Sequence, residues 1–348
     1  MDIQSILSAR LHNQFLVHPS SPEQVTRGLL GIQAQFFSHA KHAMHIRCGE
    51  TEDAALFPLL AKNWTLRGTM HLFHQADFPL FLADCGQMYR KNEWTGKSWW
   101  NQRPDWTLTP QRQQYFTGII LDALANGPMT REEMKIICRD MGMEEKEEQS
   151  FFDPWGGGVR EMCERGFMHY LAQEEKVFTL SPVIQPLAAQ DAELEMARRY
   201  FNHYGPATVH DAMYFFHAQA KKVKGWLEKL PVTAFSCNGS IYYGMDDHLQ
   251  QTGELPSCLF LAGFDPLMLG YEKKENPFLP PEHMRKIFSL SGIVMPALLM
   301  DGQVKGVWKE KGKKVTVNLF EPLTKKQMTA LEETARSLWN EKTLVFSP

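Results

Sequence analysis

The feature of this sequence that most constrains its fold is a repeated order of helical segments followed by a β-hairpin. The hairpin strands are predicted near residues 66, 167 and 232. The last hairpin is marked by Asn238-Gly239 between the apolar strands 232–237 and 240–243, and Asn-Gly in this position is the strongest short hairpin signal. Helices followed by a hairpin form the winged-helix pattern, so the recurrence predicts three such units in tandem.

The first unit is predicted to span residues 1–108. Residues 1 to about 60 are expected to be helical, with a helix start at Ser21-Pro22-Glu23, where proline occupies the first helical position. Residues 64–73 alternate between apolar and polar side chains and predict one half-buried strand. The polar face of this strand is either an ordinary solvated face or part of a site, and it carries Arg67, Thr69 and His71.

The second unit is predicted to span residues 109–188, after a polar, tryptophan-rich loop at 91–110. Its expected elements are a helix at 111–125, a capping box at 130–133 that opens another helix, a solvated acidic linker at 144–148, a short helix at 159–165, and a hairpin of strands 167–171 and 176–180. Gly156-Gly157-Gly158 precedes the short helix, and such a run either cradles a phosphate or forms a flexible turn.

The third unit is predicted to span residues 189–254, and a β-rich region follows at 255–348. In the third unit, Thr208 and Asp211 are spaced as a capping pair, and a basic helix around Lys221, Lys222 and Lys224 precedes the Asn-Gly hairpin. The last region has predicted strands at 259–261, 293–300, 303–308 and 315–320 and a final helix at 324–340. We therefore expect an α+β fold with three tandem winged-helix units followed by a C-terminal β-barrel-like domain.

Composition limits the class of protein and its compartment. The 348 residues are 43% hydrophobic and 22% charged, which is ordinary for a globular protein of several domains. No signal peptide or membrane-spanning run is read, and the six cysteines form no CxxC pair, so we expect a cytoplasmic protein with reduced thiols. The net charge of −3 gives no global argument for nucleic acid, so any such binding must come from local basic patches.

The candidate catalytic segment is Gln33-Ala34-Gln35. It places two amides around one small apolar residue at the end of a predicted helix. Positions i and i+2 point about 200° apart on a regular helix, so a converging pair needs a helix end or an irregular turn. Two neighbouring glutamines are more often ordinary surface residues, and the segment acquires weight only from the rest of the chain.

Other patterns exclude several kinds of site. His39, His42 and His45 are spaced for one helix face, but no set of Glu or Cys completes a metal site, and we expect neither a metal nor another cofactor. Walker A, GxGxxG and GxSxG motifs are absent, which excludes NTPase, dinucleotide-binding and hydrolase-elbow sites. Asp265 is predicted to be part of a structured turn or an active-site carboxylate. The basic run 309–314 is predicted to be either a solvated hairpin tip or a hairpin tip that contacts the nucleic-acid backbone.

Taken together, several stretches resemble one family, the AlkZ-like winged-helix DNA glycosylases. The matching stretches, which occur in this order over nearly the whole chain, are Gln33-Ala34-Gln35, Arg67-Gly68-Thr69-Met70-His71, Phe264-Asp265-Pro266-Leu267-Met268-Leu269-Gly270-Tyr271, and Asp301-Gly302-Gln303-Val304-Lys305-Gly306-Val307-Trp308. The family fold, three tandem winged helices with a C-terminal β-barrel, agrees with the units predicted above.

The resemblance implies that this protein is a monomeric, nucleoid-associated repair enzyme whose partner is double-stranded DNA with alkylated bases. Family members excise such bases, and some unhook interstrand crosslinks. The family's catalytic element is Gln, an apolar residue, then Gln or Asp; here it is Gln33 and Gln35, which resembles the crosslink-processing branch more than the branch with Asp. DNA-binding or supporting roles are expected for Arg67, Thr69, His71, Lys41, Arg47 and Asp265.

The chemistry of a glutamine pair suits a labile bond. A base alkylated at a ring nitrogen such as N7 of guanine is cationic and leaves readily, so the enzyme must place a water and stabilise an oxocarbenium-like sugar. A Gln carbonyl can orient that water, although it is a poor general base. The competing class is a non-catalytic winged-helix DNA-binding protein such as a transcription regulator, against which stand the tandem copies and the mildly acidic charge.

Overall fold

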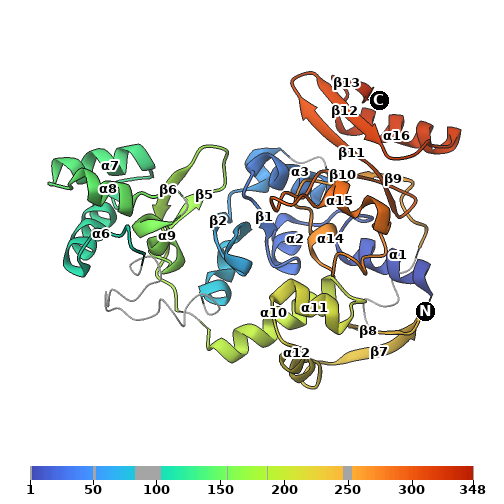
Figure 1. Cartoon of the computed structure of the whole chain (residues 1–348), viewed down its shortest axis with the longest axis horizontal. Coiled ribbons are helices and arrows are strands. Elements are labelled where there is room, and N and C mark those ends of the chain that lie inside the picture. The colour runs from blue at the N-terminus through green and yellow to red at the C-terminus, as the bar shows by residue number, and fades with distance from the viewer. Residues whose placement is uncertain are drawn as a thin grey trace. The chain divides into compact units, whose positions relative to one another are not determined.

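The computed structural model describes residues 2–49, 52–82, 103–154, 156–185, 187–245 and 253–347 (Figure 1). The chain divides into two compact units, of which one comprises Met1–Leu56 with Ala197–Pro348 and the other Phe57–Met196. The fold is mixed α+β, as predicted. Cys85 and most of the predicted loop at 91–110 lie outside the described residues. In the described part of the chain, no helix is long and apolar enough to cross a membrane.

The discontinuous unit contains most of the sequence motifs. Its helices are α1 (Ile3–Asn13), α2 (Pro22–Gly28), α3 (Phe37–Cys48), α4 (Asp53–Leu56), α11 (Val209–Phe216), α12 (Ala220–Leu227), α14 (Pro266–Leu269), α15 (Met284–Ile287) and α16 (Lys325–Leu338), and α10 (Ala189–His203) contains the boundary between the units. Its strands are β1 (Ile32–Gln33), β7 (Val232–Cys237), β8 (Ser240–Met245), β9 (Cys258–Phe260), β10 (Ala297–Met300), β11 (Gln303–Lys311), β12 (Lys314–Leu319) and β13 (Thr343–Ser347). The predicted helix start at Ser21-Pro22 is confirmed, because the Ser21 side chain caps α2.

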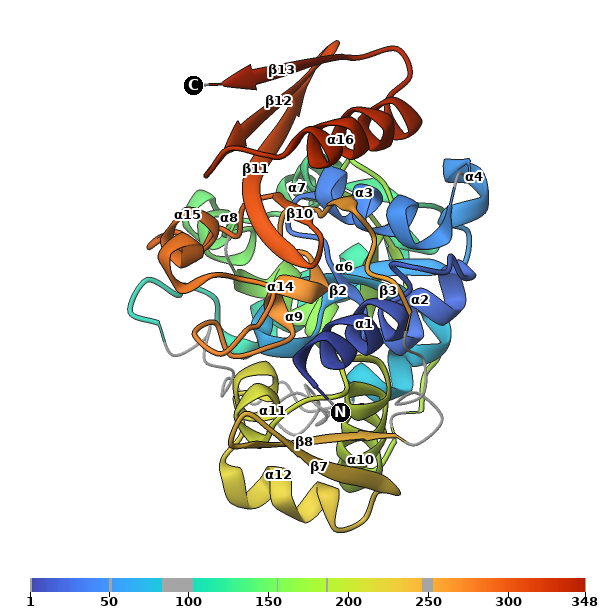
Figure 2. The same ribbon diagram turned by 90° about the vertical axis from the view of Figure 1, so that its right-hand side faces the viewer.

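The C-terminal strands form one sheet in the order β13-β12-β11-β10-β9. Helix α16 lies against this sheet (Figure 2), where Leu331 and Ala335 join Trp308 in a buried cluster. Strand β13, which was not predicted, pairs in parallel with β12. Among the described residues the sheet stays open, with β13 and β9 at its two edges, so the predicted barrel is not confirmed.

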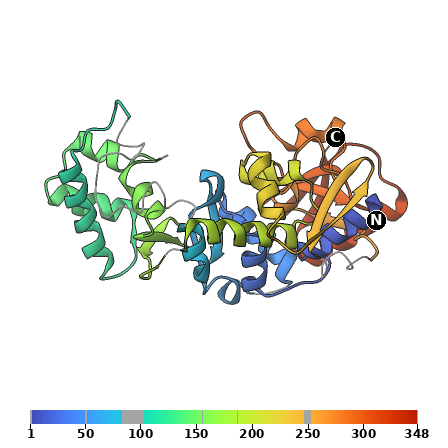
Figure 3. The same cartoon turned by 90° about the horizontal axis from the view of Figure 1, so that it is seen from below.

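The β7–β8 hairpin follows helices α11 and α12, as predicted (Figure 3). Asn238 and Gly239 have φ angles of 49° and 80°, the left-handed pair that a tight hairpin turn requires. The capping box of Thr208 and Asp211 at the start of α11 is also confirmed. Both signals are local, since each needs only residues within a few positions of one another.

The second unit contains the other two hairpins in one sheet. Its elements are β2 (Leu60–Trp64), β3 (Met70–His74), α6 (Pro110–Leu124), β4 (Met129–Thr130), α7 (Arg131–Asp140), α8 (Glu145–Phe151), α9 (Gly157–Glu164), β5 (Met168–Leu171) and β6 (Val177–Leu180). Within this unit the strands follow the order β3-β2-β5-β6-β4. The helix at 111–125, the capping box at Thr130 and the hairpin at 167–180 are confirmed. The winged-helix boundaries at 108, 188 and 254 stay a prediction.

The prediction of a single strand at 64–73 is wrong, because the structure has two strands here. Strand β2 ends at Trp64, the chain turns through Leu66–Gly68, and β3 begins at Met70, which pairs with Trp64. Arg67 has a left-handed φ of 57°, so the backbone reverses where the alternation of side chains continues. A two-residue period does not distinguish one strand from the two arms of a hairpin.

The prediction of an acidic linker at 144–148 is also wrong, because this stretch begins helix α8. Glu144 and Glu147 form a capping box at its first turn. Arg112 binds Glu147 at 2.5 Å, and the guanidinium of Arg139 binds Glu148. These ion pairs offset the repulsion among the carboxylates, and they come from residues outside the acidic run.

Candidate active site

The Gln33–Gln35 segment follows an irregular turn, which is one of the two geometries expected for a converging pair, and does not lie at the end of the predicted helix. Helix α2 ends at Gly28, and Leu30 and Gly31 have φ angles of 57° and 86° before β1 begins. Gln33 is the second residue of β1, and the chain bends at Gln35 before α3 starts. Left-handed φ at a branched residue such as Leu30 is sparsely populated, so the surrounding structure must hold this turn in place.

Buried hydrogen bonds hold the turn. The Gly31 amide donates to the Thr26 carbonyl at 2.7 Å, and the Tyr204 hydroxyl donates to the Leu29 carbonyl at 2.9 Å. Tyr204 is buried and stacks on Tyr200, so its hydroxyl position is fixed by packing. Tyr204 was not predicted as part of the site; the only local signal was its place before Gly205-Pro206.

Gly28 allows a close approach of α10 at the same place. A Cβ on Gly28 would meet the His203 ring at 2.8 Å. Arg199, also on α10, donates to the Arg27 carbonyl at 3.2 Å. Helix α10 therefore fixes the end of α2 from which the glutamine segment emerges.

The two glutamine side chains differ in exposure. Gln33 is only 9% exposed, whereas Gln35 is exposed. Neither side-chain amide has a hydrogen bond to any of the residues that the structure describes. Buried amides are normally hydrogen-bonded, so an amide in the position of Gln33 has donors and an acceptor available for a water or a substrate group.

Arg47 and Asp265 form a buried ion pair. Two guanidinium nitrogens of Arg47 donate to the Asp265 carboxylate at 2.7 and 3.0 Å, and neither side chain is exposed. Arg47 also donates to the carbonyls of Gln14 and Ala43, and Asp265 caps α14 by accepting from the Leu267 amide. Arg47 is fully buried in this structure, and its pair with Asp265 links the last turn of α3 to the start of α14. The DNA-binding or supporting role expected of the two residues stays a prediction.

Breaking this pair is expected to destabilise the protein strongly. Arg47→Ala or Asp265→Ala leaves a buried, uncompensated charge, which costs about 3–5 kcal/mol. On the same helix, Lys41→Ala removes a half-exposed ion pair and is expected to cost less than about 1 kcal/mol. Urea unfolding followed by circular dichroism measures both changes. Equal effects of Arg47→Ala and Lys41→Ala would contradict the assignment.

Lys41 and the three histidines of α3 have separate surroundings. Lys41 pairs with Asp53, and His45 also approaches that carboxylate at 3.3 Å. The Nε2 of His42 donates to the Phe260 carbonyl at 2.7 Å, and burial lowers the pKa of His42 to about 4. His39 packs on Phe264. In the described ranges no group of three His, Cys, Asp or Glu side chains is placed to hold a metal.

In the second unit, the β2–β3 hairpin brings Arg67, Thr69 and His71 together. The Nδ1 of His71 lies 2.9 Å from the Thr65 hydroxyl and 3.2 Å from the Thr69 carbonyl. A proton on Nδ1 is donated to that carbonyl and leaves Nε2 to accept from Arg67 at 3.5 Å. Burial, and then the Arg67 charge, lowers the pKa of His71 to about 3. His71 is therefore neutral near pH 7 and orients the Arg67 guanidinium.

The buried histidines predict how stability depends on pH. Burial lowers the pKa of His42 and His169 to about 4 and that of His71 to about 3, from an ordinary value of 6.5. Between these values the unfolded chain binds more protons than the folded one, so the free energy of unfolding falls as the pH drops from 6.5 towards 4. We expect urea midpoints to fall from pH 7 to pH 5.

Variants identify the groups responsible. His71→Gln or His42→Gln should flatten the decline between pH 6.5 and 5, whereas His210→Gln, at a side chain that is 66% exposed, should leave it unchanged. A decline that is identical in all three variants would contradict the assignment to buried histidines.

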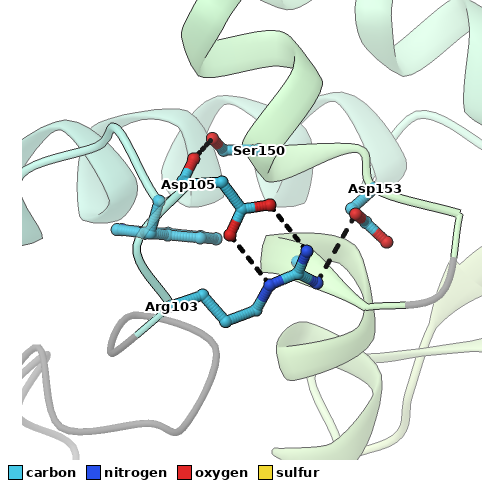
Figure 4. Close-up of a pocket in the computed structure, with 6 residues that line it drawn as sticks. Arg103, Asp105, Ser150 and Asp153 are labelled. Carbon is cyan, nitrogen blue, oxygen red and sulfur yellow. Dashed lines mark hydrogen bonds and ion pairs between the residues drawn. The ribbon is translucent and has the colours of Figure 1, made fainter.

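The triple glycine at the start of α9 serves packing. A Cβ on Gly157 would meet the Ser150 carbonyl oxygen at 2.4 Å, and one on Gly158 would meet the Phe151 ring at the same distance. The neighbouring Arg103 is already paired with Asp105 at 2.6 Å and with Asp153 at 3.5 Å (Figure 4). Two carboxylates beside one cation disfavour an anion, so the phosphate-cradle alternative has no support here.

Two exposed groups of lysines lie in the discontinuous unit. Helix α12 exposes Lys221, Lys222 and Lys224. The β11–β12 turn, taken with the strand residues that flank it, exposes Lys309, Lys311, Lys313 and Lys314. The acidic residue of this turn, Glu310, is bound by Lys342. Each group is a local basic surface despite the net charge of −3.

The class of protein follows from the similarity of this chain to a known family. A family model described as DNA glycosylase AlkZ-like matches residues 26–340 of this chain. The chain therefore belongs to the AlkZ-like DNA glycosylase family, and the resemblance inferred from its motifs is confirmed.

Two comparisons agree with this assignment. The chain is 25% identical over 364 residues to a Streptomyces sahachiroi protein named interstrand DNA cross-link repair glycosylase, covering 95% of this chain and 94% of that one. The solved structure of Streptomyces sahachiroi DNA glycosylase AlkZ matches with a TM-score of 0.77 and 22% identity over 100% of both chains. The structural likeness shows the shared mixed α+β fold.

Proposed function

We propose that this protein hydrolyses the N-glycosidic bond of bases alkylated to a cationic form, such as N7-alkylguanine, in double-stranded DNA. The observation that carries the proposal is the Gln33 amide: it is only 9% exposed and bonds to no described residue, at the end of a turn held by buried contacts. A preorganised amide of this kind stabilises a transition state without having to reorganise.

The proposed reaction needs little acid–base chemistry. The oxygen of a water forms a bond to C1′ of the deoxyribose while the C1′–N9 bond breaks, and the electron pair stays on the purine and neutralises its charge. The carbonyls of Gln33 and Gln35 accept hydrogen bonds from the water, whose proton then passes to solvent. Arg67, Thr69 and His71 are proposed as supporting residues, with the neutral His71 orienting Arg67.

Release of free base tests the proposal. The protein is incubated with duplex DNA containing N7-methylguanine, and free N7-methylguanine is separated by chromatography. Because this lesion also depurinates spontaneously, the Gln33→Ala/Gln35→Ala double variant is the matched control. Release above that control supports a glycosylase, and binding without release supports a non-catalytic DNA-binding protein.

Interstrand crosslinks are proposed as a further substrate class. The chain carries Gln at both positions of the motif, and the relative in Streptomyces sahachiroi is named for crosslink repair. Gln35 is exposed, so a bulky adduct can approach it without entering a closed base pocket. Crosslinked duplex that separates into single strands on a denaturing gel after incubation supports this extension, and duplex that stays joined contradicts it.

A further inference from the structure

Phe36 follows Gln35 directly and is 47% exposed. Its ring stacks on the ring of Phe264, with centroids 5.8 Å apart and an angle of 24° between the planes. His39 approaches the edge of the same ring at 5.9 Å. A large aromatic side chain is thus presented to solvent on an aromatic support, one residue from the proposed catalytic pair.

The support beneath Phe36 is built with unusual backbone geometry. Phe264 has a left-handed φ of 57°, a conformation that bulky residues rarely adopt. A Cβ on the preceding Gly263 would meet the His39 ring at 2.9 Å, so a side chain at this position would displace that ring. Asp265 comes next and is held by the buried pair with Arg47. Backbone strain of this kind persists where the surroundings enforce it, and it gathers at functional sites.

We propose that Phe36, backed by Phe264, is a stacking surface for a nucleobase at the lesion in the substrate duplex. The inference rests on the proposed function, because it takes the position of the lesion from Gln35. Every nucleobase has a π-face, and aromatic side chains stack on bases that are flipped, unpaired or left without a neighbour. Apolar side chains also fill the space that opens where DNA stacking is interrupted. A cationic base would add attraction between its charge and the ring.

Binding measurements that need no catalysis test this inference. Fluorescence anisotropy gives the dissociation constant of the full chain for three duplexes: one undamaged, one with a tetrahydrofuran abasic-site mimic, and one with a non-hydrolysable analogue of the N7-methylated nucleotide. Phe36→Ala is expected to weaken binding to damaged duplex by about tenfold, or about 1.4 kcal/mol, and to leave the undamaged duplex within about twofold. Phe36→Trp should bind like wild type.

The duplexes distinguish which base is stacked. Weaker binding to both damaged duplexes identifies a base that neighbours the lesion, and weaker binding only to the duplex with the alkylated analogue identifies the damaged base itself. Leu290→Ala, which truncates an apolar side chain that is 90% exposed in the same unit, is the matched control. The inference is overturned if Phe36→Ala binds damaged duplex like wild type. It is also overturned if Phe36→Ala and Phe36→Trp both weaken binding to all three duplexes equally.

The outcome is independent of base release. If wild type releases no base and Phe36→Ala still loses affinity selectively, the stacking surface stands and the glycosylase proposal fails. If wild type releases base and Phe36→Ala keeps full affinity for damaged duplex, the stacking surface fails and the glycosylase proposal stands.

Discussion

Gln35→Ala is expected to lower the rate of base release from N7-methylguanine duplex by about a hundredfold, while DNA binding and folding are retained. Loss of one positioned hydrogen-bonding group in such a site costs about 3 kcal/mol of transition-state stabilisation. Gln35 is exposed and bonds to no described residue, so its truncation removes a reaction partner and leaves the fold intact. Single-turnover release measures the rate, and an abasic-mimic duplex measures binding.

The companion variants make this expectation specific. Gln33→Ala should behave similarly, and the double variant should lose less than the sum of the two losses, because both amides act on one water. Gln35→Asp should retain activity, since a carboxylate accepts a hydrogen bond from water at least as well as an amide. Gln114→Ala, at an exposed glutamine of α6, is the control. A double variant as fast as wild type would show that the pair is not the catalytic centre.

The features that the sequence predicted correctly are local ones. The Asn238-Gly239 turn and the capping box of Thr208 and Asp211 depend on residues a few positions apart, and both form as expected. The alternation at 64–73 is local too, yet it led to the wrong element, because a hairpin keeps the same alternation in both arms. A positive φ at Arg67 leaves no recognisable mark in the sequence.

The interactions that build the site join distant parts of the chain. Arg47 and Asp265 are 218 residues apart, and the Tyr204 hydroxyl reaches the Leu29 carbonyl across 175 positions. Arg47 is buried because it pairs with Asp265, which is far away in the sequence. The sequence alone therefore does not distinguish Arg47 from an exposed basic residue that binds DNA. The resemblance to a family made Gln33 and Gln35 the candidate pair, whereas the turn before them became visible only in the structure.

Binding to duplex DNA is expected to weaken steeply with salt and to depend little on sequence. The net charge of −3 does not favour DNA, so binding must come from local basic surfaces, and the exposed lysines of α12 and of the β11–β12 turn are the two groups that we expect to carry it. Each phosphate that is neutralised releases counterions and contributes about −0.9 to the slope of log K against log salt. If about six phosphates are neutralised, affinity falls on the order of a thousandfold between roughly 50 and 200 mM salt.

Neutralising each lysine group separately identifies the surface that meets DNA. Replacing Lys221, Lys222 and Lys224 with Gln, or Lys309, Lys311, Lys313 and Lys314 with Gln, should make the slope shallower by about 0.9 for every phosphate that the variant no longer neutralises. A group that faces away from DNA leaves the slope unchanged, and this makes each set the control for the other. A lysine that contacts phosphate does not read the base, so the drop in affinity should be similar on damaged and undamaged duplex, unlike the drop expected for Phe36→Ala. Affinity that does not change with salt would show that neither basic surface carries the binding.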